Sequence, residues 1–170
     1  MNDIVEALHF LKRNYDLKHC VLLGHSAGAT LAIQVFHQFR REIMAMVLFN
    51  GIYDLVALVD EYPEYNKFVS AAFGDLDSSD WETASPTHIM LHTDVKPQHL
   101  HELVILAHSL EDELLSMQQS DLFQRVLNKV WGEEIQRKLI HGKHDDSPAS
   151  RELQDISTEA IEFVSCKLLT

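Results

Sequence analysis

The chain has 170 residues, of which 46% are apolar and 24% are charged, and such a composition is ordinary for one globular domain with a sizeable core. Its formal net charge is −12, which would repel a phosphate backbone, so we expect no nucleic-acid partner. No apolar run is long enough to span a bilayer, and the charged N-terminal residues do not suit a signal peptide. We therefore expect a single domain over residues 1–170, without a membrane partner and with a cytoplasmic location.

The first part of the chain alternates between helical and strand-like patterns. Residues 2–15 read as an amphipathic helix, Cys20 to Leu23 as a short buried strand, residues 27–40 as a helix and Ile43 to Phe49 as a second buried strand. Such an alternation is typical of a parallel sheet covered by helices on both faces. The sequence therefore predicts an α/β fold.

The second part continues this pattern less regularly. We expect Leu55 to Glu61 as a helical turn, 62–85 as an irregular loop rich in aromatic residues, Leu103 to Ala107 as a third strand, Leu114 to Val130 as a helix, Ile135 to Ile140 as an outer strand and Ser150 to Leu169 as a final helix. Residues 86–97 give no clear pattern. The cap-like loop region around 61–86 has two interpretations: it is packed by its own aromatic side chains, or it offers an aromatic wall to a substrate.

The segment Gly24-His25-Ser26-Ala27-Gly28 lies between the first strand and the helix that follows it. A Gly-x-Ser-x-Gly pattern in this context is typical of a nucleophile elbow, in which the serine occupies a sharp turn at the carboxyl edge of a sheet. Gly24 and Gly28 lack Cβ atoms, so neighbouring elements can approach the turn closely. The backbone N–H of Ala27 would face a developing oxyanion. The alternative is a turn that only caps an ordinary helix.

A nucleophilic serine needs a base that takes its proton and an acid that orients this base. In the order Ser, acid, His, the acid follows a strand after the elbow. We favour Asp112, with Glu111 and Glu113 as neighbouring alternatives that could instead be solvated acids at a helix start. The base is expected after the last strand, where we favour His144 over His141.

The histidines and cysteines raise the question of a metal site. His88 and His92 have helical His-x-x-x-His spacing, but Ile89 stands where a zinc protease has glutamate. Cys20 and Cys166 form no ligand pattern and are expected to be buried thiols. We expect no metal.

Four stretches together resemble kynurenine formamidase (arylformamidase), especially the fungal-type members of the α/β-hydrolase fold. They are Gly24 to Thr30, Gly51 to Leu55 with Glu61 to Tyr65, His108 to Leu115, and His144 to Asp146. The Gly-Ile-Tyr-Asp and Glu-Tyr-Pro-Glu-Tyr segments are much more specific than the elbow, which many hydrolases share.

The resemblance implies Ser26 as nucleophile, Asp112 as acid and His144 as base. It also makes Tyr53 and His25 candidate substrate-binding residues. The implied reaction is hydrolysis of N-formyl-L-kynurenine, a small molecule, to L-kynurenine and formate in tryptophan degradation toward NAD, without a cofactor. The oligomeric state stays open, with a homodimer as one alternative.

One departure from the family limits this expectation. Family members carry an N-terminal His-Gly-Gly-x-Trp motif that completes the oxyanion hole, and this sequence has none. The resemblance therefore implies an N-terminally truncated, partial α/β-hydrolase fold whose first strands are missing. We expect Ala27 as the remaining oxyanion donor, and weak or absent activity for this chain alone. The alternatives are a carboxylesterase for small esters and a non-catalytic fragment that binds a partner through its sheet edge.

Overall fold

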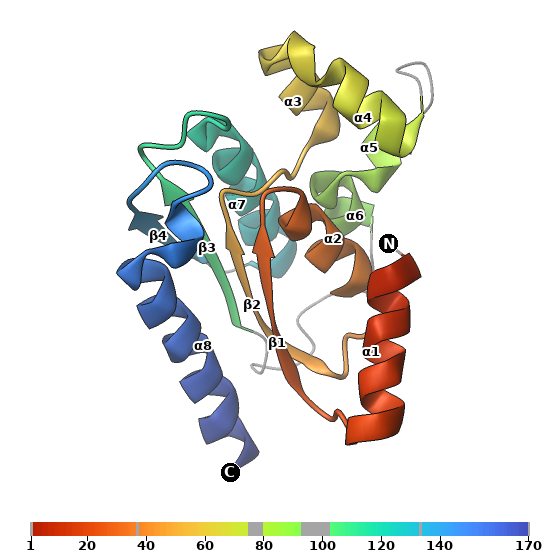
Figure 1. Ribbon diagram of the computed structural model, residues 1–170, viewed down its shortest axis with the longest axis vertical. Coiled ribbons are helices and arrows are strands. Elements are labelled where there is room, and N and C mark those ends of the chain that lie inside the picture. Colours follow the sequence, from red (N-terminus) through yellow and green to blue (C-terminus); the bar gives the residue numbers. More distant parts are fainter. Residues whose placement is uncertain (1, 37, 75–79, 93–102, 133, 170) are drawn as a thin grey trace.

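The computed structural model describes residues 2–36, 38–74, 80–92, 103–132 and 134–169 (Figure 1). Its strands are β1 (Cys20–His25), β2 (Ile43–Phe49), β3 (Leu103–Ser109) and β4 (Gln136–Ile140). Its α-helices are α1 (Asn2–Tyr15), α2 (Ala27–Phe36), α3 (Leu55–Glu61), α4 (Asn66–Phe73), α5 (Asp80–Ala84), α6 (Pro86–His92), α7 (Met117–Trp131) and α8 (Arg151–Leu168). Two short 3-10 turns, η1 (Pro63–Tyr65) and η2 (Ser147–Ala149), complete the described elements.

The described strands form one parallel sheet in the order β1-β2-β3-β4. The register pairs Leu23 with Val47 and Val47 with Ile105, so the carboxyl ends of neighbouring strands meet at one edge. β2 and β3 lie in the centre and are almost wholly buried, whereas Leu23 on β1 and Leu139 on β4 are about half exposed. The predicted α/β fold with a parallel sheet is confirmed, and the weakly patterned segment before Ile140 forms an outer strand as expected.

Helices cover both faces of this sheet (Figure 1). One face packs against α1, α2, α6 and α7 in a core that includes Ile33, Met46 and Phe123. The other face is covered by α8, whose Ile156 packs in a cluster with Val47. From Ala45 to Phe49 the side chains of β2 alternate between the two clusters because successive residues of a strand point to opposite faces.

The prediction of an irregular loop over residues 62–85 is wrong for the described part of this segment. It contains η1, α4 and α5, which lie with α3 beyond the carboxyl ends of the strands (Figure 1). Trp81 is buried in a third core cluster with Val69, and its indole N–H donates to the carbonyl of Gly74 at 2.7 Å. Helices of five to eight residues are too short to show a repeated apolar stripe, so the sequence pattern missed them.

Several helix boundaries differ from the prediction. The helix after the elbow ends at Phe36 rather than at Arg40. α7 begins at Met117 rather than at Leu114, because the Ser116 hydroxyl caps its first turn. α1, β2 and α3 have the predicted bounds. Of the poorly patterned segment 86–97, residues 86–92 form α6, and residues 93–97 lie outside the described residues.

The two cysteines are free thiols, and one of them departs from the expectation of burial. Cys166 is exposed on α8, on the side of the helix away from the sheet cluster. Cys20 is partly buried, and this burial, followed by the charge of Glu42, raises the pKa of its thiol.

Tyr53 carries a buried hydroxyl that finds no hydrogen-bond partner among the described residues. Its ring is fully buried and stacks on Phe123 with centroids 4.5 Å apart. Because a buried, unpaired hydroxyl loses its hydrogen bonds to water without replacement, Tyr53→Phe is expected to raise the free energy of unfolding by about 1 kcal/mol. Urea denaturation measures this change. Tyr65→Phe is the control, because the Tyr65 hydroxyl donates to the Leu114 carbonyl at 3.3 Å; a gain in stability from both variants would contradict this explanation.

Candidate active site

Ser26 occupies the sharp bend between β1 and α2. Its φ is +54°, a left-handed conformation that non-glycine residues rarely adopt. The backbone on either side holds this bend in place. The Ser26 N–H donates to the Phe49 carbonyl at 3.2 Å, and its own carbonyl accepts from the N–H groups of Ala29 (3.0 Å) and Ile52 (3.2 Å). The motif therefore has the strand–turn–helix setting that a nucleophile elbow requires.

The two glycines of the motif differ in what surrounds them. A Cβ on Gly24 would lie 2.8 Å from both the Ala29 Cα and the Gly28 carbonyl oxygen, so the chain passes too close for any side chain. A Cβ on Gly28 would meet nothing within 4 Å among the described residues. The expectation that both glycines permit close packing is therefore correct for Gly24 and wrong for Gly28.

This difference gives a paired prediction. Gly24→Ala forces backbone against backbone and is expected to lower the free energy of unfolding by about 3 kcal/mol. Gly28→Ala places a methyl group in open space on α2 and is expected to stabilise the protein by up to about 1 kcal/mol, because alanine favours helix. Thermal denaturation of both variants tests the pair, and equal losses of stability would show that the bend does not depend on Gly24 alone.

Asp112 and His144 come from different loops and form a buried hydrogen-bonded pair. His144 Nδ1 lies 2.8 Å from Asp112 Oδ2, and both side chains are almost inaccessible to water. The other carboxylate oxygen accepts from the backbone N–H groups of Leu114 and Leu115, each at 2.9 Å. A carboxylate with these donors has a fixed orientation, so it in turn fixes the imidazole and keeps its Nδ1 protonated.

The backbone of His144 is also held on both sides. Its N–H donates to the Glu113 carboxylate at 3.0 Å. Its carbonyl accepts from the Ser147 hydroxyl at 3.0 Å and lies 3.1 Å from His25 Nε2, which donates to it. The bond from the His144 N–H is the main reason why the pKa of Glu113 lies below its usual range. The loops after β3 and β4 therefore form one connected structure.

The alternatives to Asp112 and His144 lie in other surroundings. His141 is exposed, and its Nδ1 lies 3.0 Å from the Glu152 carboxylate. Glu111 accepts from the backbone N–H of Gly142 at 3.2 Å, so its carboxylate contacts the loop backbone. Among the acids and histidines considered from the sequence, the pair that meets in a buried site is Asp112 with His144.

Ser26 and His144 line the same cavity, which has a volume of about 190 Å³. Its other lining residues are mostly apolar and come from the β2–α3 loop, from η1 and α4, and from the loop between β3 and α7: Ile52, Tyr65, Phe68, Leu114 and Leu115. No hydrogen bond joins the Ser26 hydroxyl to the His144 ring within the described part of the chain. In unliganded enzymes such bonds are often long and tighten when substrate binds. The Ala27 N–H, in the first turn of α2, is one of the amides without an acceptor inside its helix.

The two residues expected to bind substrate have other positions. Tyr53 lies in the core and does not line the Ser26 cavity, so its location does not support that prediction. His25 stacks on Phe49 with centroids 5.0 Å apart and lies against the His144 ring. Burial, followed by the neighbouring His144, lowers the pKa of His25, which favours a neutral ring beside His144.

The sequence did not predict the structural roles of two buried polar residues, His108 and Gln119. His108 lies beside Asp112. Its Nε2 donates to the Leu115 carbonyl at 3.1 Å and lies 3.8 Å from Asp112 Oδ2, while its Nδ1 accepts from the Ser120 hydroxyl at 2.7 Å. Burial lowers the pKa of His108, so this ring stays neutral. Gln119 fixes the chain after β2, because its Oε1 accepts from the N–H groups of Tyr53 and Asp54.

The position of Gln119 in the sequence could have indicated this role. It lies four residues after Leu115 and four before Phe123, on the apolar side of α7. A polar residue on such a stripe is expected to have buried partners.

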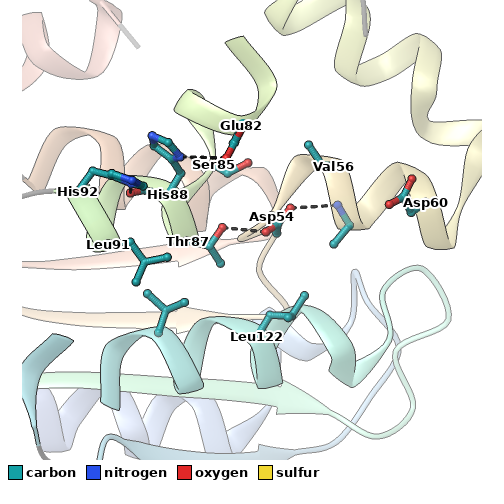
Figure 2. A pocket seen from close by; sticks show the side chains of 12 residues that line it. Asp54, Val56, Asp60, Glu82, Ser85, Thr87, His88, Leu91, His92 and Leu122 are labelled. Atoms are coloured by element: carbon teal, nitrogen blue, oxygen red, sulfur yellow. Dashed lines mark hydrogen bonds and ion pairs between the residues drawn. The ribbon is translucent and has the colours of Figure 1, made fainter. Parts of the chain in front are cut away.

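A second cavity, of about 470 Å³, lies between α3, α6 and α7 (Figure 2). Asp54 on its wall caps α3 through the Ala57 N–H and also accepts from the Thr87 hydroxyl at 2.9 Å. His88 and His92 stack on each other here, and His88 lies 3.5 Å from Glu82. Within the described ranges, no three His, Cys, Asp or Glu residues are grouped to hold a metal ion.

Comparison with known proteins identifies the family. The sequence pattern of a family described as alpha/beta hydrolase fold matches residues 1–142. The chain belongs to the α/β-hydrolase family. Among solved structures, the chain resembles the acylaminoacyl peptidase of Pyrococcus horikoshii, with a TM-score of 0.66 and 23% identity. The similarity covers 83% of this chain and 22% of that one. At this identity the likeness supports the fold alone.

Curated relatives give a narrower comparison within the α/β hydrolases. The chain is 35% identical over 133 residues to a kynurenine formamidase of Meyerozyma guilliermondii, covering 72% of this chain and 50% of the relative. It is 30% identical over 154 residues to the kynurenine formamidase of Scheffersomyces stipitis, covering 74% and 56%. The resemblance to fungal kynurenine formamidases is thus confirmed, and the chain spans about half the length of these relatives. None of the described helices combines the length and apolar character needed to cross a bilayer.

Proposed function

We propose that this chain carries the nucleophile, base and acid of a kynurenine formamidase-type serine hydrolase, which hydrolyses N-formyl-L-kynurenine to L-kynurenine and formate. Ser26 is the nucleophile, His144 the general base and Asp112 the acid that orients it. We also propose that the protein is cytoplasmic and monomeric or homodimeric. It acts on a small molecule, without a nucleic-acid or membrane partner.

The proposed reaction follows from these roles. His144 Nε2 takes the Ser26 hydroxyl proton while the oxygen attacks the formyl carbon, and the Ala27 N–H donates to the oxyanion. The C–N bond then breaks, and the imidazolium gives its proton to the leaving arylamine. Water, deprotonated by the same imidazole, attacks the formyl ester; this step releases formate and restores the serine.

One observation supports this proposal more than any other: Ser26 and His144 line the same cavity, and His144 is bonded to the buried Asp112. Ser26 is placed there by its left-handed backbone conformation. The name of the fungal relatives, kynurenine formamidase, supports the choice of substrate. The two arguments are independent, because one is geometric and the other compares sequences.

The test uses the whole chain, with a fluorophosphonate probe and N-formyl-L-kynurenine. We expect the probe to modify a single peptide containing Ser26, and the chain to release kynurenine slowly, because Ala27 is the expected remaining oxyanion donor. The absorbance of kynurenine follows the release. Pretreatment with the probe should stop that release. Modification elsewhere, or kynurenine release that continues after complete modification of Ser26, would contradict the assignment.

A second candidate is a carboxylesterase for small esters, favoured by the cavity itself. Its described walls include Ile52, Phe68 and Leu114, which suit an apolar acyl group. Its volume of about 190 Å³ is below the roughly 300–1,000 Å³ of typical drug-sized sites. Rates with p-nitrophenyl acetate and butyrate, compared with N-formyl-L-kynurenine, separate the two functions. Turnover of esters alone would favour the carboxylesterase.

A further inference from the structure

Asn50 occupies a second left-handed position at the carboxyl edge of the sheet. It directly follows β2, its φ is +43°, and it is wholly buried. Its backbone N–H donates to the Ala107 carbonyl on β3 at 3.0 Å. Asparagine is one of the few non-glycine residues that tolerate this conformation. A glycine would also meet the backbone requirement, so the side chain of Asn50 needs a separate explanation.

The Asn50 side chain joins the loops that carry the acid and the base. Its Oδ1 accepts from the Ser109 N–H at 2.9 Å, at the start of the loop that leads to Asp112. Its Nδ2 donates to the Ser147 hydroxyl at 2.8 Å, and that hydroxyl donates to the His144 carbonyl at 3.0 Å. All four residues in this chain of hydrogen bonds are buried.

Only a side chain with a donor and an acceptor can make both contacts of Asn50. Because Asn50 Nδ2 donates to the Ser147 oxygen, the Ser147 hydroxyl keeps its own proton for another acceptor. It donates this proton to the His144 carbonyl. The side chain therefore sets the direction of the Ser147 bond as well as the spacing of the two loops. Buried bonds of this kind are strong because no water competes for the donors.

We propose that Asn50 is a positioning residue, which acts through Ser147 to hold His144 at the correct distance from Ser26. The inference rests on the proposed function, in which His144 is the base. Asn50 touches neither substrate nor the reacting atoms. Its effect on rate arises because a displacement of about 1 Å in a catalytic group can cost about 10²-fold in rate.

The first experiment measures the second-order rate of Ser26 modification by the fluorophosphonate probe in Asn50→Asp, Ser147→Ala and the double variant. In Asn50→Asp the carboxylate accepts from Ser147, whose hydroxyl then leaves the His144 carbonyl. Each single variant is expected to react about 10- to 100-fold more slowly. The double variant should lose no more than the slower single variant, because both changes break the same connection. Asn50→Gly, which keeps the left-handed backbone, replaces Asn50→Asp if the buried carboxylate prevents folding.

Gln119→Met is the matched control. Gln119 is also a wholly buried amide that joins the chain after β2 to another element, but it has no bond to His144. This variant is expected to lower the unfolding midpoint and leave the rate of Ser26 modification within about 2-fold. A rate loss in Gln119→Met equal to that in Asn50→Asp would mean that general loosening explains both, and would overturn the inference.

The second experiment reads the position of His144 without the serine reaction. The proton on His144 Nδ1, bonded to Asp112, should give a far-downfield ¹H NMR signal that Asp112→Asn removes. We expect Asn50→Asp and Ser147→Ala to shift or broaden this signal, and Gln119→Met to leave it in place. An unchanged signal in both folded variants would overturn the role of Asn50. A signal that responds as expected in a chain that the probe fails to modify would contradict the proposed function and support the positioning role.

Discussion

Ser26→Ala is expected to reduce kcat for the proposed hydrolysis by about 10³-fold or more and to abolish fluorophosphonate modification. The variant removes the oxygen that is proposed to form the acyl intermediate and leaves the Asp112–His144 pair intact. Residual rate comes from water in the cavity, with little help from the base. Single-turnover kinetics with N-formyl-L-kynurenine or an ester measures the loss.

Ser26→Gly is the matched variant, and the two differ in stability. Ser26 has a φ of +54°, which alanine tolerates as poorly as serine does and glycine adopts freely. Both variants should be inactive, but Ser26→Gly is expected to be about 1 kcal/mol more stable than Ser26→Ala. Equal stabilities would show that the bend stores no strain, and full activity in either variant would rule out Ser26 as nucleophile.

Asp112→Asn is expected to lower kcat by about 10⁴-fold while the fold is retained. If the new amide oxygen keeps the N–H groups of Leu114 and Leu115, its NH₂ group faces His144 Nδ1. That ring must then accept at Nδ1 and carry its proton on Nε2, which is the wrong tautomer for taking the serine proton. The rate of ester hydrolysis near neutral pH measures this effect.

Glu111→Gln is the control for Asp112→Asn. Glu111 is one residue away and bonds to the Gly142 N–H, a contact that the glutamine oxygen can also make. Its rate is expected to stay within about 3-fold of the unchanged chain. If Glu111→Gln and Asp112→Asn caused similar losses, loop structure rather than orientation of His144 would be the cause.

The elements with long apolar patterns could be predicted from the sequence. β2 and α1 have the expected bounds, and the parallel sheet follows from the alternation of helices and strands. The order of Ser26, Asp112 and His144, each after its own strand, was enough to propose one site because the carboxyl ends of parallel strands meet at one edge. The buried Asp112–His144 bond agrees with that hypothesis.

Features that depend on contacts between distant segments could not be predicted. The helices α4 and α5 are too short for periodicity, and Trp81 is placed by packing rather than by local pattern. Asn50 resembles any turn residue until the Ser147 loop is brought beside it. Gly28 is a case in which the sequence motif misled the prediction. Its motif position suggested a crowded site, but a Cβ there would meet none of the described neighbours.

The late position of α8 has a consequence for biosynthesis. This helix covers one face of the sheet and follows the loop that carries His144. While the ribosome is still adding α8, the nascent chain has a serine on a bend and an acid, but its His144 loop has no docked helix to follow it. We therefore expect hydrolytic competence to appear only after α8 has been synthesised and has docked on the sheet beside the His144 loop.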